Sequence, residues 1–301
     1  MTAIRTKPLG TLALLATIVL GACSGSGATS APSSAGSSAP GGGSGAVNCA
    51  TGSITAAGST ALQPLVDAAG KQYTAACSGA TIQVQGGGSG TGLTQVLQGA
   101  VQIGDSDVTA EEKLKPDEAS QLVNHDVVKQ GWVMVTSTDV TGVTNLTSRQ
   151  ATDIWTGKIT NWKDVGGPDE AIVLILRPES SGTRATFKKL VLGGAQEASG
   201  QALTEDSNGA VTQAVTQTPG STSVIGFAYY QQNKSGLTAL QLDGVDASVD
   251  NMKAGTYKLA AIGHMYSKGE ADGLTKAFLD YMVSADVQNT LLPSLFYAGV
   301  K

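Results

Sequence analysis

Three segments of the chain place glycine and hydroxyl residues where an apolar run ends and a helical pattern begins. They are residues 58–62, 86–93 and 177–184. The first N–H groups of a helix have no partner within it, and the positive end of the helix dipole attracts anions. Each cluster alone is more typical of an ordinary helix cap. Three of them in one chain, one beside an arginine, favour a site for an oxyanion.

Two charged residues add to this pattern. Arg177 directly follows the apolar run 172–176, so we expect it at the carboxyl end of a strand, where ligands bind in open α/β sheets. Its planar guanidinium suits an oxyanion. Asp107 closes the segment 103–107 after another short apolar run. An aspartate at such a place is, on its own, more often a turn residue.

Catalytic and metal-binding motifs have less support in the sequence. There is no Gly-x-Ser-x-Gly elbow, no Gly-x4-Gly-Lys-Ser/Thr loop and no Cys/His cluster, so we expect no enzyme, no cofactor and no metal. His125 and His264 are the only histidines, and a structural role is favoured for both. A phosphate-ester hydrolase that uses a serine near an arginine stays an alternative, as does an adhesin or sensor that kept the fold.

The elements that would position these residues alternate between short β runs and amphipathic helices, which predicts an α/β fold with mainly parallel sheets. Strands are predicted at 54–57, 81–85, 101–103, 132–137, 172–176, 224–230 and 258–266. Helical patterns cover 62–73, 93–97, 146–155, 187–191, 274–282 and 287–292. The periodicity alone does not decide between one large domain and two.

The chain is acidic. Its 301 residues have a formal net charge of −5, and since Arg5 and Lys7 are the only charged residues among the first 22, the remainder has 17 basic and 24 acidic residues, a net charge of −7. Such a chain has no overall field to attract nucleic acid. Any anion site must therefore be built locally.

The N-terminus has the pattern of a targeting segment. Two basic residues precede the apolar run 9–20, which is too short to span a bilayer. We interpret residues 1–22 as a lipoprotein signal peptide, because the small residues before Cys23 resemble a lipobox; an ordinary secretory signal is the alternative. Residues 23–46, rich in Gly, Ser and Ala, are predicted to be a flexible tether. Cys23 would then be acylated and hold the chain at the outer face of the cytoplasmic membrane.

Cys49 and Cys77 are the two cysteines that remain. Cys49 lies five residues before Ile54 and Cys77 five before Ile82, each near the start of a predicted strand, so the two should lie at the same end of neighbouring parallel strands. An even pair in an exported protein favours a disulfide. Two free, buried thiols are the alternative.

Several motifs together resemble the PstS family, the phosphate-binding proteins of bacterial phosphate ABC transporters. The resemblance extends from residue 54 nearly to the C-terminus, and its strength lies in the order and spacing of the motifs. They occupy residues 58–65, 86–92, 103–107, 156–162, 177–183 and 225–230.

The resemblance implies a two-lobed type II periplasmic-binding-protein fold. Each lobe would have a central, mainly parallel sheet flanked by helices, and two crossover hinges would join the lobes. Lobe one would comprise residues 47–133 and 260–301, and lobe two residues 134–259. The implied phosphate ligands are Ser59, Thr60, Ser89, Asp107, Arg177, Ser181, Gly182 and Thr183.

Some details of this implied site stay open. Thr60 is followed by the small Ala61, which makes backbone contacts there less secure than those at 177–183. Ser106 and Arg184 adjoin the matched positions and could touch the ligand or pair with Asp107. Phosphate has no face for stacking, so the tryptophans, Trp132 among them, are predicted to pack in the core or between lobes.

The expected function is capture of inorganic phosphate in the cleft and delivery to the permease subunits of a phosphate ABC transporter. The protein is expected to act as a monomer, attached to the membrane by its lipid and without nucleic acid. Binding of sulfate or molybdate is the alternative within the same class. Asp107 discriminates between phosphate and these anions, because a carboxylate accepts a hydrogen bond from the proton that phosphate keeps and sulfate lacks.

Overall fold

The computed structural model describes residues 47–199 and 202–300. The predicted signal peptide (1–22), the tether (23–46) and the acylation site Cys23 lie outside the described residues. Within the described part of the chain, no helix has both the length and the apolar character needed to cross a membrane.

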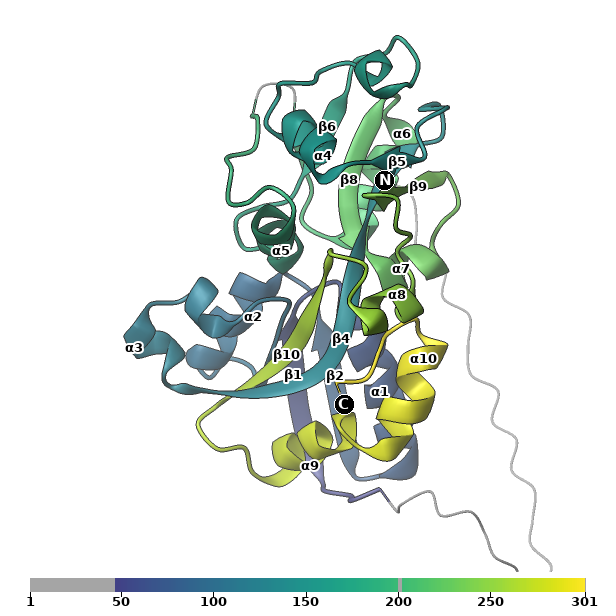
Figure 1. Cartoon of the computed structure of the whole chain (residues 1–301). Coiled ribbons are helices and arrows are strands. Elements are labelled where there is room, and N and C mark those ends of the chain that lie inside the picture. Colours follow the sequence, from purple (N-terminus) through teal and green to yellow (C-terminus); the bar gives the residue numbers. More distant parts are fainter. Residues whose placement is uncertain (1–46, 200–201, 301) are drawn as a thin grey trace, which may run out of the picture. The chain divides into compact units, whose positions relative to one another are not determined.

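Strands and helices alternate along the chain, as the hydrophobic pattern predicts (Figure 1). The strands are β1 (Gly52–Gly58), β2 (Ala80–Gln85), β3 (Ile103–Ser106), β4 (Leu122–Ser137), β5 (Asn145–Leu146), β6 (Val173–Leu176), β7 (Leu203–Thr204), β8 (Ser221–Gly226), β9 (Leu237–Leu242) and β10 (Ala260–Lys268). The α-helices are α1 (Gln63–Ala76), α2 (Ser89–Leu97), α3 (Pro116–Ala119), α4 (Ser148–Trp155), α5 (Gly182–Leu190), α6 (Asn208–Gln217), α7 (Phe227–Gln232), α8 (Val249–Ala254), α9 (Gly273–Met282) and α10 (Leu292–Ser294). Three further single turns are η1 (Ala110–Glu112), η2 (Trp162–Val165) and η3 (Val287–Leu291).

The strands form a mixed sheet in the order β2-β1-β3-β10-β4-β8-β6-β7, with β9 paired to β4 and β5 paired to β9. Pairing is parallel between β1 and its neighbours β2 and β3, and between β6 and its neighbours β7 and β8. It is antiparallel in the middle, around β4 and β10. We call the part built on β2, β1, β3 and β10 lobe one, and the part built on β8, β6, β7, β9 and β5 lobe two.

Strand β4 belongs to both lobes. It pairs with β10 as far as Gly131, which lies opposite Ala260, and with β8 from Trp132, which lies opposite Gly226. Figure 1 shows β4 as the long strand that runs from one set of strands into the other. A single strand of 16 residues thus carries the chain between the two halves of a two-lobed α/β fold.

Helices cover both faces of the sheet in lobe one. In β1, Ile54 and Ala56 face an apolar cluster under α1 and α9, whereas Ala57 faces a second cluster under α2. The core of lobe two contains all three tryptophans. Trp132, Trp155 and Trp162 are buried there, which confirms their prediction as packing residues.

The sequence prediction was wrong at the end of β8. Residues 224–230 were expected to be one strand, but β8 ends at Gly226 and Phe227 begins α7. The run Phe-Ala-Tyr-Tyr has the aromatic composition of a strand. Its length does not separate a strand from a buried helical turn, so tertiary packing decided.

Strand β4 also begins ten residues before the predicted start, at Leu122 instead of Trp132. His125, assigned to a surface stretch, is a half-buried residue of this strand, with Nε2 3.4 Å from Ser267 Oγ. His264 lies in β10 as expected, and its Nδ1 is 2.8 Å from Asp126 Oδ1. These contacts are compatible with the structural role favoured for both histidines.

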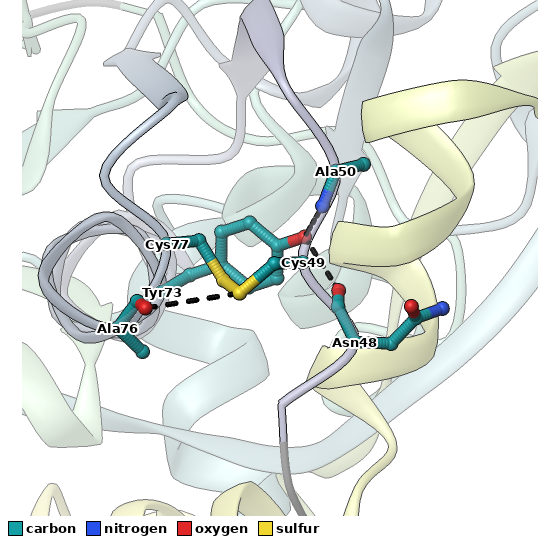
Figure 2. The surroundings of a disulfide bond; sticks show 6 residues. All are labelled: Asn48, Cys49, Ala50, Tyr73, Ala76 and Cys77. Atoms are coloured by element: carbon teal, nitrogen blue, oxygen red, sulfur yellow. Dashed lines mark hydrogen bonds between the residues drawn. A yellow bond between two sulfur atoms is a disulfide. The ribbon is translucent and has the colours of Figure 1, made fainter.

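Cys49 and Cys77 form a disulfide bond, which confirms the predicted pair (Figure 2). Their Cα atoms are 5.3 Å apart, and the parallel register of Gly52 with Ala80 brings the two segments together. The Tyr73 hydroxyl, which donates to the Asn48 carbonyl at 2.8 Å, fixes the same segment. Closing a loop of 28 residues contributes about 3–4 kcal/mol in the chain-entropy model.

Candidate anion-binding site

The helices α1, α2 and α5 begin close together, although α5 belongs to lobe two. Gly182, the first residue of α5, shows how close the approach is. A Cβ atom on Gly182 would lie 2.7 Å from the Asp107 Cβ and nearer still to the Ser89 Oγ. Only glycine permits this contact, so Gly182 brings the start of α5 against lobe one.

Asp107 lies at this meeting point, directly after β3, and is 3% exposed. Its Oδ1 accepts hydrogen bonds from the Ser59 hydroxyl and from Gln130 Nε2, the latter at 2.9 Å. Its Oδ2 accepts from Thr183 Oγ1 of lobe two at 3.3 Å. Burial raises the pKa of Asp107 above its ordinary value, and these hydrogen bonds and the charge of Arg177 offset this only in part. The carboxylate is therefore held by uncharged donors from both lobes.

Arg177 follows β6, as predicted, and is 4% exposed. It donates from Nε to the Glu205 carbonyl at 3.0 Å and from Nη2 to the Asp206 carbonyl at 2.9 Å. Nη2 also donates to Thr60 Oγ1 of lobe one at 3.3 Å. Burial lowers the pKa of Arg177, and Asp107 raises it. Among the described residues, no carboxylate forms an ion pair with this guanidinium.

Among the helices α1, α2 and α5, only α5 is capped by a hydroxyl of its cluster, whereas the Ser59 hydroxyl fixes the turn that precedes α1. Ser59 Oγ accepts from the N–H groups of Ala61 and Leu62, at 3.1 and 3.2 Å. Ser181 Oγ accepts from the Arg184 N–H at 3.2 Å. Binding to helix N–H groups and binding to Asp107 are not exclusive here, because the Ser59 hydroxyl does both.

The structure brings the predicted ligand residues to one place. Ser89 Oγ accepts from the Asp107 N–H at 2.9 Å, and the remaining members lie on the three helix starts or beside β6. Ser106 and Arg184 have other partners. Ser106 Oγ donates to the Val108 carbonyl at 2.6 Å, and Arg184 pairs with Glu179 and Glu197 within lobe two.

Three residues of this network were not assigned to it from the sequence. Gln130 lies in β4 and donates to Asp107, while Trp132 Nε1 donates to Thr183 Oγ1 at 3.1 Å. Asn208, the first residue of α6, contacts Arg177 at 3.4 Å. A polar residue inside a buried strand was the available signal for Gln130. For Asn208, the run Ser207-Asn208-Gly209 before a helical pattern was a fourth cluster like the other three.

The two lobes also meet at the surface. Lys113 Nζ of lobe one donates to the carbonyls of Glu179 and Ser181 at 2.6 and 3.3 Å, and Lys189 pairs with Glu112 at 3.2 Å. A pocket of about 570 Å³, which we call the mouth, is lined by Glu112, Lys113, Glu179 and Lys189 among others. A second groove, of about 390 Å³, has Thr60 and Asn208 among its lining residues.

Comparisons with known proteins give a consistent result. A model of the PBP superfamily domain matches residues 27–286. The chain is 47% identical to the phosphate-binding protein PstS of Bacillus subtilis, over 83% of this chain and 82% of the relative.

Solved structures of phosphate-transport proteins are also similar to this chain. A substrate-binding protein with bound phosphate from Clostridium perfringens is 28% identical, with a TM-score of 0.75 over 83% of this chain and all of the other. An ABC-type phosphate transport receptor from Vibrio cholerae is also 28% identical, with a TM-score of 0.64 over 82% of this chain and all of the other.

Proposed function

This chain belongs to the PstS family of phosphate-binding proteins, within the PBP superfamily, and we propose that it captures inorganic phosphate between its lobes for a phosphate ABC transporter. The observation that carries the proposal is the buried Asp107, which accepts hydrogen bonds from Ser59 of lobe one and Thr183 of lobe two. A carboxylate at the meeting point of three helix starts suits an anion that carries its own proton. Inorganic phosphate near neutral pH is such an anion.

The donors proposed for phosphate come from both lobes. Lobe one supplies Ser59, Thr60 and Ser89, and lobe two supplies the segment 177–183 with Arg177, Ser181, Gly182 and Thr183. A phosphate dianion, one arginine and one carboxylate leave a net charge of −2 in the site. The remaining stabilisation must come from backbone N–H groups and hydroxyls at the helix starts.

Asp107 would select phosphate over sulfate. Phosphate donates a P–OH hydrogen bond to the carboxylate, whereas sulfate presents another acceptor and brings two anions together without a proton between them. Sites that depend on one buried hydrogen bond reject a ligand lacking it by roughly 10⁴–10⁵-fold. This selection separates the proposal from the alternative of a sulfate- or molybdate-binding protein.

Closure of the lobes around the ion is part of the proposal. We place lobe one at residues 47–133 and 260–301 and lobe two at 134–259, with crossovers near 130–136 and 258–263. The change of strand partners after Gly131 and the start of β10 at Ala260 support this division. Small-angle scattering should give a smaller radius of gyration with phosphate. An unchanged profile at saturation would contradict closure.

The N-terminal sequence supports the proposed attachment, and membership of the family supports the proposed partner. Cys23 would carry the lipid, residues 24–46 would let the body move above the outer face of the membrane, and the permease subunits would receive phosphate from a monomer. Partitioning into a detergent phase should be lost in Cys23→Ala. Partitioning that persists would mean another anchor.

Calorimetric titration of the purified protein with phosphate, arsenate and sulfate tests the proposed function. We expect heat of binding with phosphate at one site per chain and much weaker binding of sulfate. Equal affinity for sulfate, or no phosphate binding, would overturn the proposal. Turnover of a chromogenic phosphate ester that is lost on mutation of Ser59 or Ser181 would favour the hydrolase instead.

A further inference from the structure

Asn208 occupies a junction that the binding proposal does not use. It is the first residue of α6 and is 1% exposed. Its Oδ1 accepts from Arg177 Nη1 at 3.4 Å and from the Gly226 N–H at 3.3 Å. Its Nδ2 donates to the Thr60 carbonyl at 2.9 Å. Two donors on one end of the amide and an acceptor on the other fix its orientation.

The partners of Asn208 belong to different parts of the molecule. Arg177 begins the lobe-two segment of the site, and Gly226 ends β8 opposite Trp132, where β4 passes between the lobes. Thr60 belongs to lobe one. Asn208 therefore connects the arginine of one lobe to the backbone of the other.

The segment before α6 also determines where the guanidinium lies. The carbonyls of Glu205 and Asp206 accept from Arg177 Nε and Nη2, and Asn208 accepts from Nη1. A guanidinium is planar, so three acceptors around its edge fix both its position and its plane. The segment 205–208 thus orients Arg177, and Asn208 is the member of it whose side chain also reaches lobe one.

We propose that Asn208 is a positioning residue that couples the orientation of Arg177 to closure of the lobes on phosphate. Separation of the lobes would break two bonds to Thr60 together, one from Asn208 Nδ2 and one from Arg177 Nη2. Because both bonds are buried, water does not replace them while the lobes are closed. This role rests on the proposed function, since it concerns retention of the same ion.

A double-mutant cycle tests the coupling. Phosphate affinity is measured by calorimetry for the unmodified protein, Asn208→Ala, Arg177→Lys and the double variant. Asn208→Ala should weaken binding roughly 10- to 100-fold, as expected when buried hydrogen-bonding groups lose a partner. In the Arg177→Lys protein the same change should cost clearly less than in the unmodified protein, because the guanidinium that Asn208 orients is gone and only the bond to the Thr60 carbonyl is still lost.

The matched control is Asn233→Ala. Asn233 lines the groove of about 390 Å³ that Asn208 also lines, but it is exposed. Its side chain donates to the Tyr229 carbonyl of α7, the helix that it directly follows. The affinity of the Asn233→Ala variant for phosphate should equal that of the unmodified protein. Small-angle scattering adds a second readout, since Asn208→Ala should need more phosphate to reach the smaller radius of gyration.

The outcomes separate the two proposals. If the unmodified protein does not bind phosphate, the proposed function fails. If it binds and Asn208→Ala binds equally well, or if Asn208→Ala costs the same in both backgrounds, Asn208 does not act through Arg177 and this inference is wrong. Should Asn208→Ala fail to fold by circular dichroism, Asn208→Ser takes its place in the cycle.

Discussion

The contact between the lobes has a buried interior, around Asp107 and Arg177, and an exposed mouth. Charged side chains have different kinds of partner in these two regions. In the interior, Asp107 and Arg177 are almost fully buried and are bonded to uncharged groups. At the mouth, Lys189 and Glu112 pair directly, with side chains 62% and 30% exposed. The interior keeps its charges available to a ligand, whereas at the mouth two cations, Lys189 and Arg184, pair with carboxylates and Lys113 donates to backbone carbonyls.

The difference has an energetic reason. A buried charge without a counter-charge loses hydration, and hydrogen bonds from fixed dipoles only partly replace it. A ligand that brings the missing charge or proton therefore gains much from the interior. Exposed pairs are screened by salt and contribute about 0–1 kcal/mol. Substitutions in the interior should consequently change binding by orders of magnitude, and those at the mouth by small factors.

Replacement of the carboxylate should have the largest effect. Asp107→Asn can rotate its amide to offer a donor, so sulfate should gain relative to phosphate and most of a preference of roughly 10⁴–10⁵-fold should disappear. Competitive titration with both anions measures the ratio. Asp105→Asn, two residues away and also buried, is the control and should keep the preference. An unchanged ratio in Asp107→Asn would contradict the role of Asp107 as acceptor of the P–OH hydrogen bond.

Loss of the close approach between the start of α5 and lobe one should have the second-largest effect on binding. Gly182→Ala would place a methyl group between the start of α5 and Asp107, so closure should fail and phosphate affinity should fall about 100-fold or more, since misplacement of about 1 Å has such consequences. The control is Gly209→Ala, also in a first helical turn, whose added Cβ would meet no atom nearer than the Tyr229 hydroxyl at 3.3 Å; this variant should bind normally. Calorimetry and thermal unfolding of both variants distinguish lost closure from lost folding.

Asp105 sharpens the comparison, because it is an interior acid outside the proposed ligand set. It is buried, and within the described part of the chain its Oδ1 has no hydrogen-bond partner. Burial, and then the charges of Asp107 and Asp67, raise its pKa well above the ordinary value. An acid with a raised folded-state pKa stabilises the fold fully only below its unfolded pKa, near 3.8, and that stability is lost as the pH rises through the folded pKa.

Asp105→Asn should remove this dependence. Above about pH 4, the unmodified protein should lose stability relative to the variant. The difference between their free energies of unfolding should grow by about 1.4 kcal/mol per pH unit, until the carboxyl group of Asp105 ionises in the folded protein. Urea unfolding of both proteins between pH 4 and 9 measures the difference. Parallel curves would show that Asp105 ionises normally in the folded protein.

The smallest effect is expected at the mouth. Lys189→Ala removes the exposed pair with Glu112 and should weaken phosphate binding by less than about fivefold at low salt. The difference should vanish at 1 M salt, where the screening length is about 3 Å. A loss that persists at high salt would mean that the mouth contributes more than screened surface charge.

Much of the fold and of the site could be predicted from local sequence. The helix starts at residues 59–63, 89 and 182 were marked by glycine and hydroxyl residues, and Arg177 by its place after an apolar run. Such signals are local, because capping and strand length depend on neighbouring residues. The prediction of a strand at 224–230 was wrong because it, too, used only local signals. A short apolar run has no local feature that separates a strand from a buried helix.

By itself the sequence determined the alternating elements and the clusters that could hold an anion, and it favoured the disulfide between Cys49 and Cys77 that the structure contains. Only the tertiary structure decided which polar residues meet around them. Gln130, Trp132 and Asn208 reach Asp107, Thr183 and Arg177, respectively, across 23, 51 and 31 positions of sequence. Hydrogen bonds of this kind depend on how strands and helices pack in three dimensions, and spacing along the chain does not encode them.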